Sequence, residues 1–254
     1  CASHQGAAIH TDRVNAWLGN LGLSDSDFRC GPQEPSDRPT MEALIRAGEK
    51  PCQVHNNCSG KHAGFLTLTR HLKAGPDYVT PDHAVQKACL EAFESVTGES
   101  SPGFGIDGCS APNFATTLHG MARAMAFFAA AEEGSGVRAS AAARLAKAMR
   151  LHPELVAGEG RACTELMRAM EGRVALKTGA EAFFIAIIPE KKLGVALKVV
   201  DGGTRGAEAA ITAILVQLGL LDAAHPAARK RLNAPIRNWN GIETGMIRPG
   251  AAFR

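Results

Sequence analysis

Two polar, glycine-containing loops carry side chains that could ligate a metal ion. The first is Cys58-Ser59-Gly60-Lys61-His62, and the second is Asp107-Gly108-Cys109. Thiolates are good zinc ligands, and two cysteines with one further donor could form a site that keeps a position open. The paired Cys-x-x-Cys spacing of common zinc sites is absent from both loops. The residue types alone therefore leave two interpretations open, a metal site and two unrelated loop cysteines.

A serine and a lysine far apart in the chain could supply nucleophilic chemistry. Lys177 begins the tripeptide Lys177-Thr178-Gly179 in front of an apolar run, and the same tripeptide lines the active site of serine β-lactamases and penicillin-binding proteins. A serine hydroxyl becomes a good nucleophile when a neutral lysine takes its proton. Ser3 and Lys177 would suit such a pair if the fold brings them together. An ordinary turn serine and an edge lysine are the alternatives.

The loop Gly158-Glu159-Gly160-Arg161 is a third candidate. It is typical of a tight turn that leads into a helix, where the helix dipole favours an acidic side chain. Arg161 could instead bind a substrate carboxylate through two parallel hydrogen bonds.

Apolar spacing predicts the helices that must position these side chains. Helical spacing runs from Ala63 to Leu72, so we expect the Cys58 loop to lie at a helix start. Thr80-Pro81-Asp82 predicts another helix start, with a capping threonine and a proline in the first turn, and Gly98 ends that helix. We expect further helices at 12–21, 40–47, 114–132, 139–150 and 161–170.

The apolar pattern changes at Gly172. A continuous apolar run is typical of a strand buried on both faces. We therefore expect a mainly helical region over 80–170, a strand–hairpin–strand–helix region over 172–220 (174–176, 183–188, 195–200 and 205–218) and a turn-rich tail over 235–254. Helices grouped apart from an antiparallel sheet indicate an α+β fold. Nothing marks an internal boundary, so we expect a single domain over 1–254.

Composition excludes several classes of function. The chain has 254 residues and a net charge of +3, and its lysine and arginine clusters, Lys191-Lys192 and Arg229-Lys230-Arg231, are short. We therefore expect no nucleic-acid partner. No apolar run reaches the roughly 20 residues that span a bilayer, which excludes a membrane-spanning role. The seven cysteines form no compact framework, which indicates reduced thiols and a cytoplasmic location.

Six segments occur in order along the chain. They are Cys1-Ala2-Ser3-His4, the block from His55 to His62, Asp107-Gly108-Cys109, the block from His152 to Arg161 (HPELVAGEGR), Lys177-Thr178-Gly179-Ala180, and the block from Asn240 to Gly245 (NGIETG). Together they resemble the Rhizobium-type L-asparaginase II family from residue 1 almost to the C-terminus. The CSGKH and HPELVAGEGR blocks are the most diagnostic.

The resemblance implies a fold, a reaction and a site. It implies a serine β-lactamase-like α+β fold, with an antiparallel sheet and a helical subdomain, and a homodimer. It implies hydrolysis of L-asparagine to L-aspartate and ammonia beside a zinc ion. The residues implied on this chain are Ser3 and Lys177 for catalysis, Cys58, Lys61 and Cys109 for zinc, and His62 and Asp107 in the substrate surroundings, to which Arg161 is added as a candidate for the substrate carboxylate.

The resemblance also implies a second Ser–Lys pair, a Ser-x-x-Lys motif that precedes the Cys1–His4 segment in the family. We therefore expect that the N-terminal part of the family domain is missing from these 254 residues. Two alternative functions stay open. One is a serine hydrolase of the penicillin-recognising type, which would not need Cys58, Lys61 and Cys109. The other is a zinc-binding or ligand-binding remnant without catalytic activity.

Overall fold

The computed structural model of the chain describes residues 3–251, and these form two compact units. Within the described residues, unit 1 comprises 3–120 together with Glu154–Gly158, and unit 2 comprises Met121–Pro153 together with 159–251. The single domain expected over 1–254 stays a prediction. Among the described residues, every helix is too short or too polar to cross a membrane.

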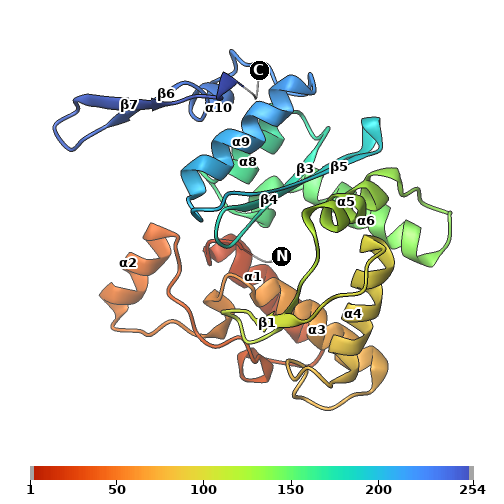
Figure 1. The fold of residues 1–254 in the computed structure, drawn as a ribbon. Helices are drawn as coiled ribbons and strands as arrows, with labels where there is room; N and C mark the ends of the chain where they lie inside the picture. Colours follow the sequence, from red (N-terminus) through yellow and green to blue (C-terminus); the bar gives the residue numbers. More distant parts are fainter. Residues whose placement is uncertain (1–2, 252–254) are drawn as a thin grey trace. The chain divides into compact units, whose positions relative to one another are not determined.

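Helices dominate unit 1 (Figure 1). They are α1 (Ala8–Asn20), α2 (Arg38–Ala47), α3 (Ser59–Leu72) and α4 (Ala84–Thr97), with short 3-10 turns η1 (Asp25–Asp27) and η2 (Gln53–His55). The first three match the predicted helices to within four residues at each end. The core of unit 1 is built on α1, α3 and α4 and includes Leu18, Phe28, Leu66, Tyr78 and Val85.

The predicted start of the fourth helix is wrong by about one turn. Thr80 closes a turn in which its hydroxyl donates to the carbonyl of Asp77 at 3.0 Å, so this side chain does not cap a helix. The cap is His83, whose Nδ1 accepts from the N–H of Val85 at 3.1 Å. The predicted end is confirmed, since Gly98 adopts a left-handed φ of 68° there.

A small antiparallel hairpin lies where a loop was expected. Strands β1 (Phe104–Ile106) and β2 (Pro112–Phe114) pair with Ile106 opposite Pro112. The predicted helix at 114–132 is consequently shorter, and α5 spans Leu118–Ala130. The hairpin matters for the site because its connecting turn carries Asp107 and Cys109.

Unit 2 contains a three-stranded antiparallel sheet in the order β3-β4-β5. The strands are β3 (Ala175–Gly179), β4 (Phe183–Ile188) and β5 (Leu193–Lys198). The 3-10 turn η3 (Pro189–Lys191) connects β4 to β5. The buried central strand is confirmed, since only Phe183 of β4 is not fully buried. Lys177 lies within β3, opposite Ile185, whereas the strand predicted at 174–176 ended one residue before it.

Three of the remaining helices match predicted ones: α6 (Val137–Leu151), α8 (Ala162–Ala169) and α9 (Thr204–Gln217). Two short helices were not predicted: α7 (Pro153–Val156), at the division between the two units, and α10 (Pro226–Arg229). Helices packed with small antiparallel sheets confirm a mixed α+β fold. The serine β-lactamase-like topology stays a prediction.

The tail of the chain contains a second missed hairpin. Strands β6 (Ala234–Arg237) and β7 (Glu243–Ile247) pair only with each other, and the hairpin extends away from α10, in dark blue in Figure 1. Most of its side chains are exposed. It therefore lacks the apolar alternation by which a half-buried strand is recognised in sequence.

Gly194 in β5 gives a sharp stability prediction. A Cβ at this position would lie 2.1 Å from the carbonyl oxygen of Ala122 and 2.2 Å from the amide nitrogen of Ala126, both in the backbone of α5. Backbone atoms of a packed helix cannot move aside cheaply, so we expect Gly194→Ala to lower the free energy of unfolding by at least about 3 kcal/mol. Urea unfolding measures this.

The matched control is Gly245→Ala in β7, where the added Cβ would meet only the Cδ1 atom of Ile236 at an ordinary 3.7 Å. This variant should unfold at nearly the parental urea concentration. Equal midpoints for the two variants would contradict the close packing of β5 on α5.

Candidate active site and metal centre

The two loops predicted to carry metal ligands come together in unit 1. The Nζ atom of Lys61 lies 3.0 Å from the Sγ atom of Cys109 and 3.2 Å from Oδ2 of Asp107. The Sγ atoms of Cys58 and Cys109 and a carboxylate oxygen of Asp107 all lie within 4.8 Å of one another. We call Cys58, Lys61, Asp107 and Cys109 the Cys–Lys cluster.

Two local structures position the Cys–Lys cluster. Cys58 is the residue before α3, and its N–H donates to Oδ1 of Asn56 at 2.9 Å, while the amide of Asn56 donates to the carbonyls of Cys30 and Gly31. Lys61 follows on the first turn of the helix. Asp107 and Cys109 lie on the β1–β2 turn, which is closed by the N–H of Asp107 donating to Ala111 at 2.9 Å.

Both thiols of the cluster are buried, Cys58 with 8% and Cys109 with 3% of its surface exposed. The neighbouring side chains of Cys58, His62 and Lys61, the last of which donates to its sulfur at 3.0 Å, hold the pKa of the Cys109 thiol well below its usual range, although burial acts in the opposite direction. The proximity of Cys109, together with burial, raises the pKa of Cys58. The cluster therefore favours one thiolate, on Cys109, next to one protonated thiol.

Lys61 balances the negative charge of the cluster. Burial by itself would lower the pKa of Lys61, but Cys58, Cys109 and Asp107 outweigh that effect and raise it. A lysine ligates a metal only as the neutral amine, and a cation held by the thiolates would favour that form.

The donor chemistry of the cluster fits zinc. Two thiol sulfurs, an amine nitrogen and a carboxylate oxygen are all atoms that zinc accepts as ligands, and a site with three protein ligands leaves a position for substrate or water. His62 adds a second indication, because its buried Nε2 atom has no hydrogen-bond partner among the described residues. Asp107, predicted as a substrate-binding residue, lies within the same donor group.

Ser3 is held against the loop that carries Cys58. Its backbone N–H donates to the carbonyl of Asn57 at 2.7 Å, and its φ of 76° lies in the left-handed region. A non-glycine residue adopts this conformation at a cost, and such residues cluster at active sites. The structure thus places the predicted catalytic serine beside the Cys58 segment.

His4 is a site residue that sequence reasoning missed. It is 2% exposed. Its Nδ1 accepts from the N–H of Gly6 at 3.0 Å, so Nε2 carries the proton and donates to Oγ of Ser59 at 2.9 Å. His4 therefore ties the Ser3 turn to the first residue of α3. Its only signal in the sequence is its place next to Ser3.

His4 predicts a pH dependence of stability. Burial and the nearby His10 lower the pKa of His4 from the usual 6.5 to about 3. The folded chain then keeps His4 neutral, while the unfolded chain binds a proton below about pH 6.5. The stability that follows from this difference in proton binding is fully present above about pH 6.5 and is lost as the pH falls towards 3. From about pH 7.5 to about pH 5 we expect a loss of about 2 kcal/mol.

The measurement is the free energy of unfolding in urea at several pH values. His4→Asn keeps an acceptor for Gly6 but does not titrate, so its stability should fall less steeply with acid. His71→Asn, at an exposed histidine, should keep the parental slope. A parental slope in His4→Asn would contradict the assignment to His4.

Lys177 and Arg161 lie close to one thiol in unit 2. Both act electrostatically on Cys163, whose sulfur accepts from the N–H of Thr178 at 3.2 Å. Lys177 is half-buried in β3 and donates to the carbonyl of Thr178 at 2.8 Å, and Arg161 is the residue before α8. Ser3 lies in unit 1 and Lys177 in unit 2, and their pairing stays a prediction.

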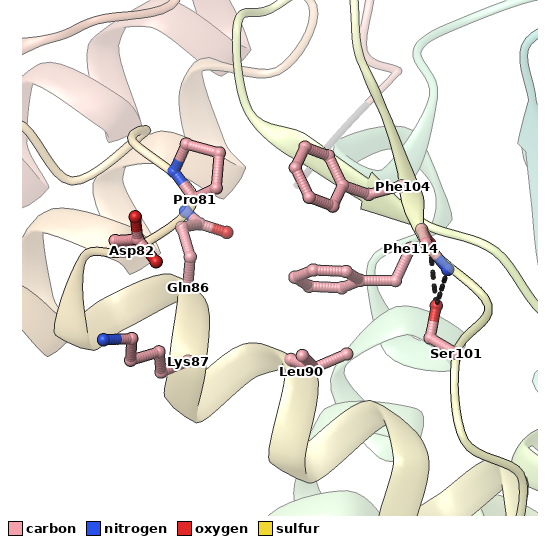
Figure 2. Close-up of a pocket in the computed structure, with 9 residues that line it drawn as sticks. Pro81, Asp82, Gln86, Lys87, Leu90, Ser101, Phe104 and Phe114 are labelled. Atoms are coloured by element: carbon pink, nitrogen blue, oxygen red, sulfur yellow. Dashed lines mark hydrogen bonds between the residues drawn. The ribbon is translucent and has the colours of Figure 1, made fainter.

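A separate pocket of about 240 Å³ lies in unit 1 between the start of α4 and the β1–β2 hairpin. In Figure 2, Pro81, Gln86 and Leu90 face Phe104 and Phe114 across it. None of the site residues predicted from sequence lines this pocket. One residue of its wall also contacts the core of unit 1, because Nε2 of Gln86 donates to the carbonyl of Tyr78 at 2.8 Å.

Comparisons with known proteins agree with the motifs. A search of curated proteins found no match to this sequence. The sequence model of the L-asparaginase II family, in contrast, matches residues 1–249. That range contains the Cys–Lys cluster and the other residues predicted to form the site. The match extends over nearly the whole chain, and the chain therefore belongs to the L-asparaginase II family.

Proposed function

We propose that this chain is an amidohydrolase that converts L-asparagine to L-aspartate and ammonia. The observation that carries the proposal is the family match over residues 1–249. The Cys–Lys cluster, with its two buried thiols, supports it, because a thiolate, an amine and a carboxylate converge there beside the loop that holds Ser3. Groups of interacting ionisable side chains with shifted pKa values are more frequent at functional sites than elsewhere.

Ser3 and Lys177 carry the proposed chemistry. The neutral amine of Lys177 takes the proton of the Ser3 hydroxyl as Oγ attacks the side-chain amide carbon of asparagine. The carbon–nitrogen bond then breaks, the proton passes to the leaving nitrogen, and ammonia departs. A water molecule hydrolyses the resulting ester, which releases aspartate and returns the proton to Ser3.

Three side chains would bind the substrate. The guanidinium of Arg161 suits the α-carboxylate, since it can donate two parallel hydrogen bonds. Asp107 and His62 would lie in the surroundings of the substrate in unit 1, where the carboxylate of Asp107 suits an ammonium group. Glutamine is longer by one methylene, which would misplace its amide relative to Ser3, so we expect it to be a poor substrate.

Cys58, Lys61 and Cys109 would hold a zinc ion. The ion supplies a fixed positive charge that polarises a bound oxygen atom and favours the neutral amine of Lys61. The proposal also includes a serine β-lactamase-like topology, a homodimer and a cytoplasmic location.

Ammonia release by the purified protein tests the function, with zinc content and intact mass recorded on the same sample. Turnover of L-asparagine, with L-glutamine much slower, would support the proposal. Hydrolysis of a β-lactam or a simple ester without asparagine turnover would favour the penicillin-recognising alternative. Bound zinc with no amide hydrolysis would favour a remnant without catalytic activity.

A further inference from the structure

Tyr78 is a fully buried residue in the core of unit 1 that no family motif or site prediction includes. None of its surface is exposed. Its hydroxyl nevertheless makes two hydrogen bonds. The N–H of Arg29 donates to it at 2.8 Å, and Nδ1 of His62 lies 2.9 Å away. A buried hydroxyl needs such partners, and one of the two partners here is a side chain of the predicted site.

The directions of these two bonds follow from the number of protons available. The hydroxyl has one proton, and the N–H of Arg29 is a donor and cannot accept it. Among the described residues, Nδ1 of His62 is the only other hydrogen-bond partner of this oxygen. Burial raises the pKa of Tyr78, so the hydroxyl keeps its proton and donates it to Nδ1. Because Nδ1 of His62 accepts, the proton of the ring lies on Nε2.

His62 lies next to the Cys–Lys cluster at the start of α3. It follows Lys61 directly, and its backbone N–H donates to the carbonyl of Cys58, one helical turn earlier, at 3.0 Å. Residues four positions apart lie on the same face of a helix. The Nε2 atom of His62 is buried and has no partner within hydrogen-bond geometry among the described residues, and a buried N–H without a partner is costly.

The surrounding rings hold this arrangement in place. His62 packs edge-on against Phe28, Phe65 and Tyr78, with ring centroids 6.5, 5.4 and 5.5 Å apart. The carbonyl of Tyr78 is fixed in turn by Gln86. Neither ring can rotate freely, so the hydroxyl decides which nitrogen of His62 is protonated.

We propose that Tyr78 is a positioning residue of the metal centre, whose hydroxyl fixes His62 in the tautomer that offers Nε2–H to the sulfur of Cys109. The inference rests on the proposed function, because it gives the Cys–Lys cluster the role of a metal site. Outer partners of this kind orient the direct ligands of a metal and tune their charge.

The test uses Tyr78→Phe, which keeps the ring and removes only the hydroxyl. The first readout is the nitrogen chemical shifts of the His62 ring by nuclear magnetic resonance, assigned by comparison with His62→Gln. The parent protein should show protonated Nε2 and unprotonated Nδ1, and Tyr78→Phe should lose that pattern. A protonated Nδ1 in the parent, or the same pattern in both proteins, would overturn the inference, whether or not the protein binds zinc.

The second readout is the metal. We expect Tyr78→Phe to bind zinc about tenfold to a hundredfold more weakly, and to change the sulfur-to-metal absorption of the cobalt-substituted protein. Thr69→Val removes another buried hydroxyl from unit 1, one that donates to the carbonyl of Phe65, and should change neither quantity. A cooperative thermal unfolding transition would verify that both variants fold.

The two readouts separate the inference from the proposed function. If Tyr78→Phe loses the tautomer and the parent protein binds no metal, the positioning of His62 would be supported and the zinc site contradicted. Unchanged zinc affinity and cobalt absorption in Tyr78→Phe, in a parent that does bind metal, would contradict a role for Tyr78 in the metal centre.

Discussion

Cys109→Ser is expected to abolish stoichiometric zinc binding and, with it, turnover of L-asparagine. Cys109 is the thiolate of the Cys–Lys cluster, because the neighbouring side chains of Cys58, His62 and Lys61 lower its pKa and so favour its deprotonated form. A serine hydroxyl has nearly the same shape but stays protonated near neutral pH. If the three protein ligands share a binding free energy of the size measured for zinc sites, losing one weakens binding by roughly 10²–10⁴-fold. Zinc content after gel filtration and affinity by competition with a chelator measure the effect.

The matched control is Cys89→Ser. Cys89 is a half-buried cysteine of α4 that lies outside the cluster, and its replacement should leave zinc content and turnover close to the parental values. Parental zinc content in Cys109→Ser would remove Cys109 from the metal site. Loss of zinc with full asparagine turnover would show that the metal has no part in the reaction.

The members of the candidate site were predictable because they occur in motifs, but their geometry was not. Neither loop has the spacing of a zinc site, and the 3.0 Å approach of Lys61 to Cys109 depends on a helix start and a hairpin turn 48 residues apart. The hairpin itself has three exposed residues in its first strand. A pattern of buried and exposed positions could not predict it.

Single polar residues that act through the fold were missed for a different reason. His4 and Tyr78 have no characteristic spacing, and each resembles an ordinary core residue until its partners are known. His4 bonds to Ser59, which is 55 positions away, and Tyr78 bonds to His62 across a turn of the chain. Both residues act through contacts with other segments of the chain, and such contacts cannot be predicted from a single sequence.

Secondary structure was predicted best where burial is one-sided or complete. The run from Phe183 to Ile188 forms the predicted strand with the predicted ends, because a continuous apolar run of this short length suits a strand buried on both faces. The start of α4 was misplaced because Thr80 and Pro81 suit a turn as well as a helix start. The choice depends on His83, whose ring supplies the cap, and a histidine is not a usual capping residue.

The Ser3–Lys177 pair gives the other large expected effect. Ser3→Ala and Lys177→Met should each lower kcat for L-asparagine by about 10³-fold or more, because a hydroxyl without its base, or a base without its hydroxyl, gives no activated nucleophile. If the two groups act as a unit, the double variant should lose no more than either single one. Lys191→Met, at an exposed lysine of η3, should keep parental activity. Losses that multiply in the double variant would mean that Ser3 and Lys177 act independently. Full activity in Ser3→Ala would assign the nucleophile to another hydroxyl.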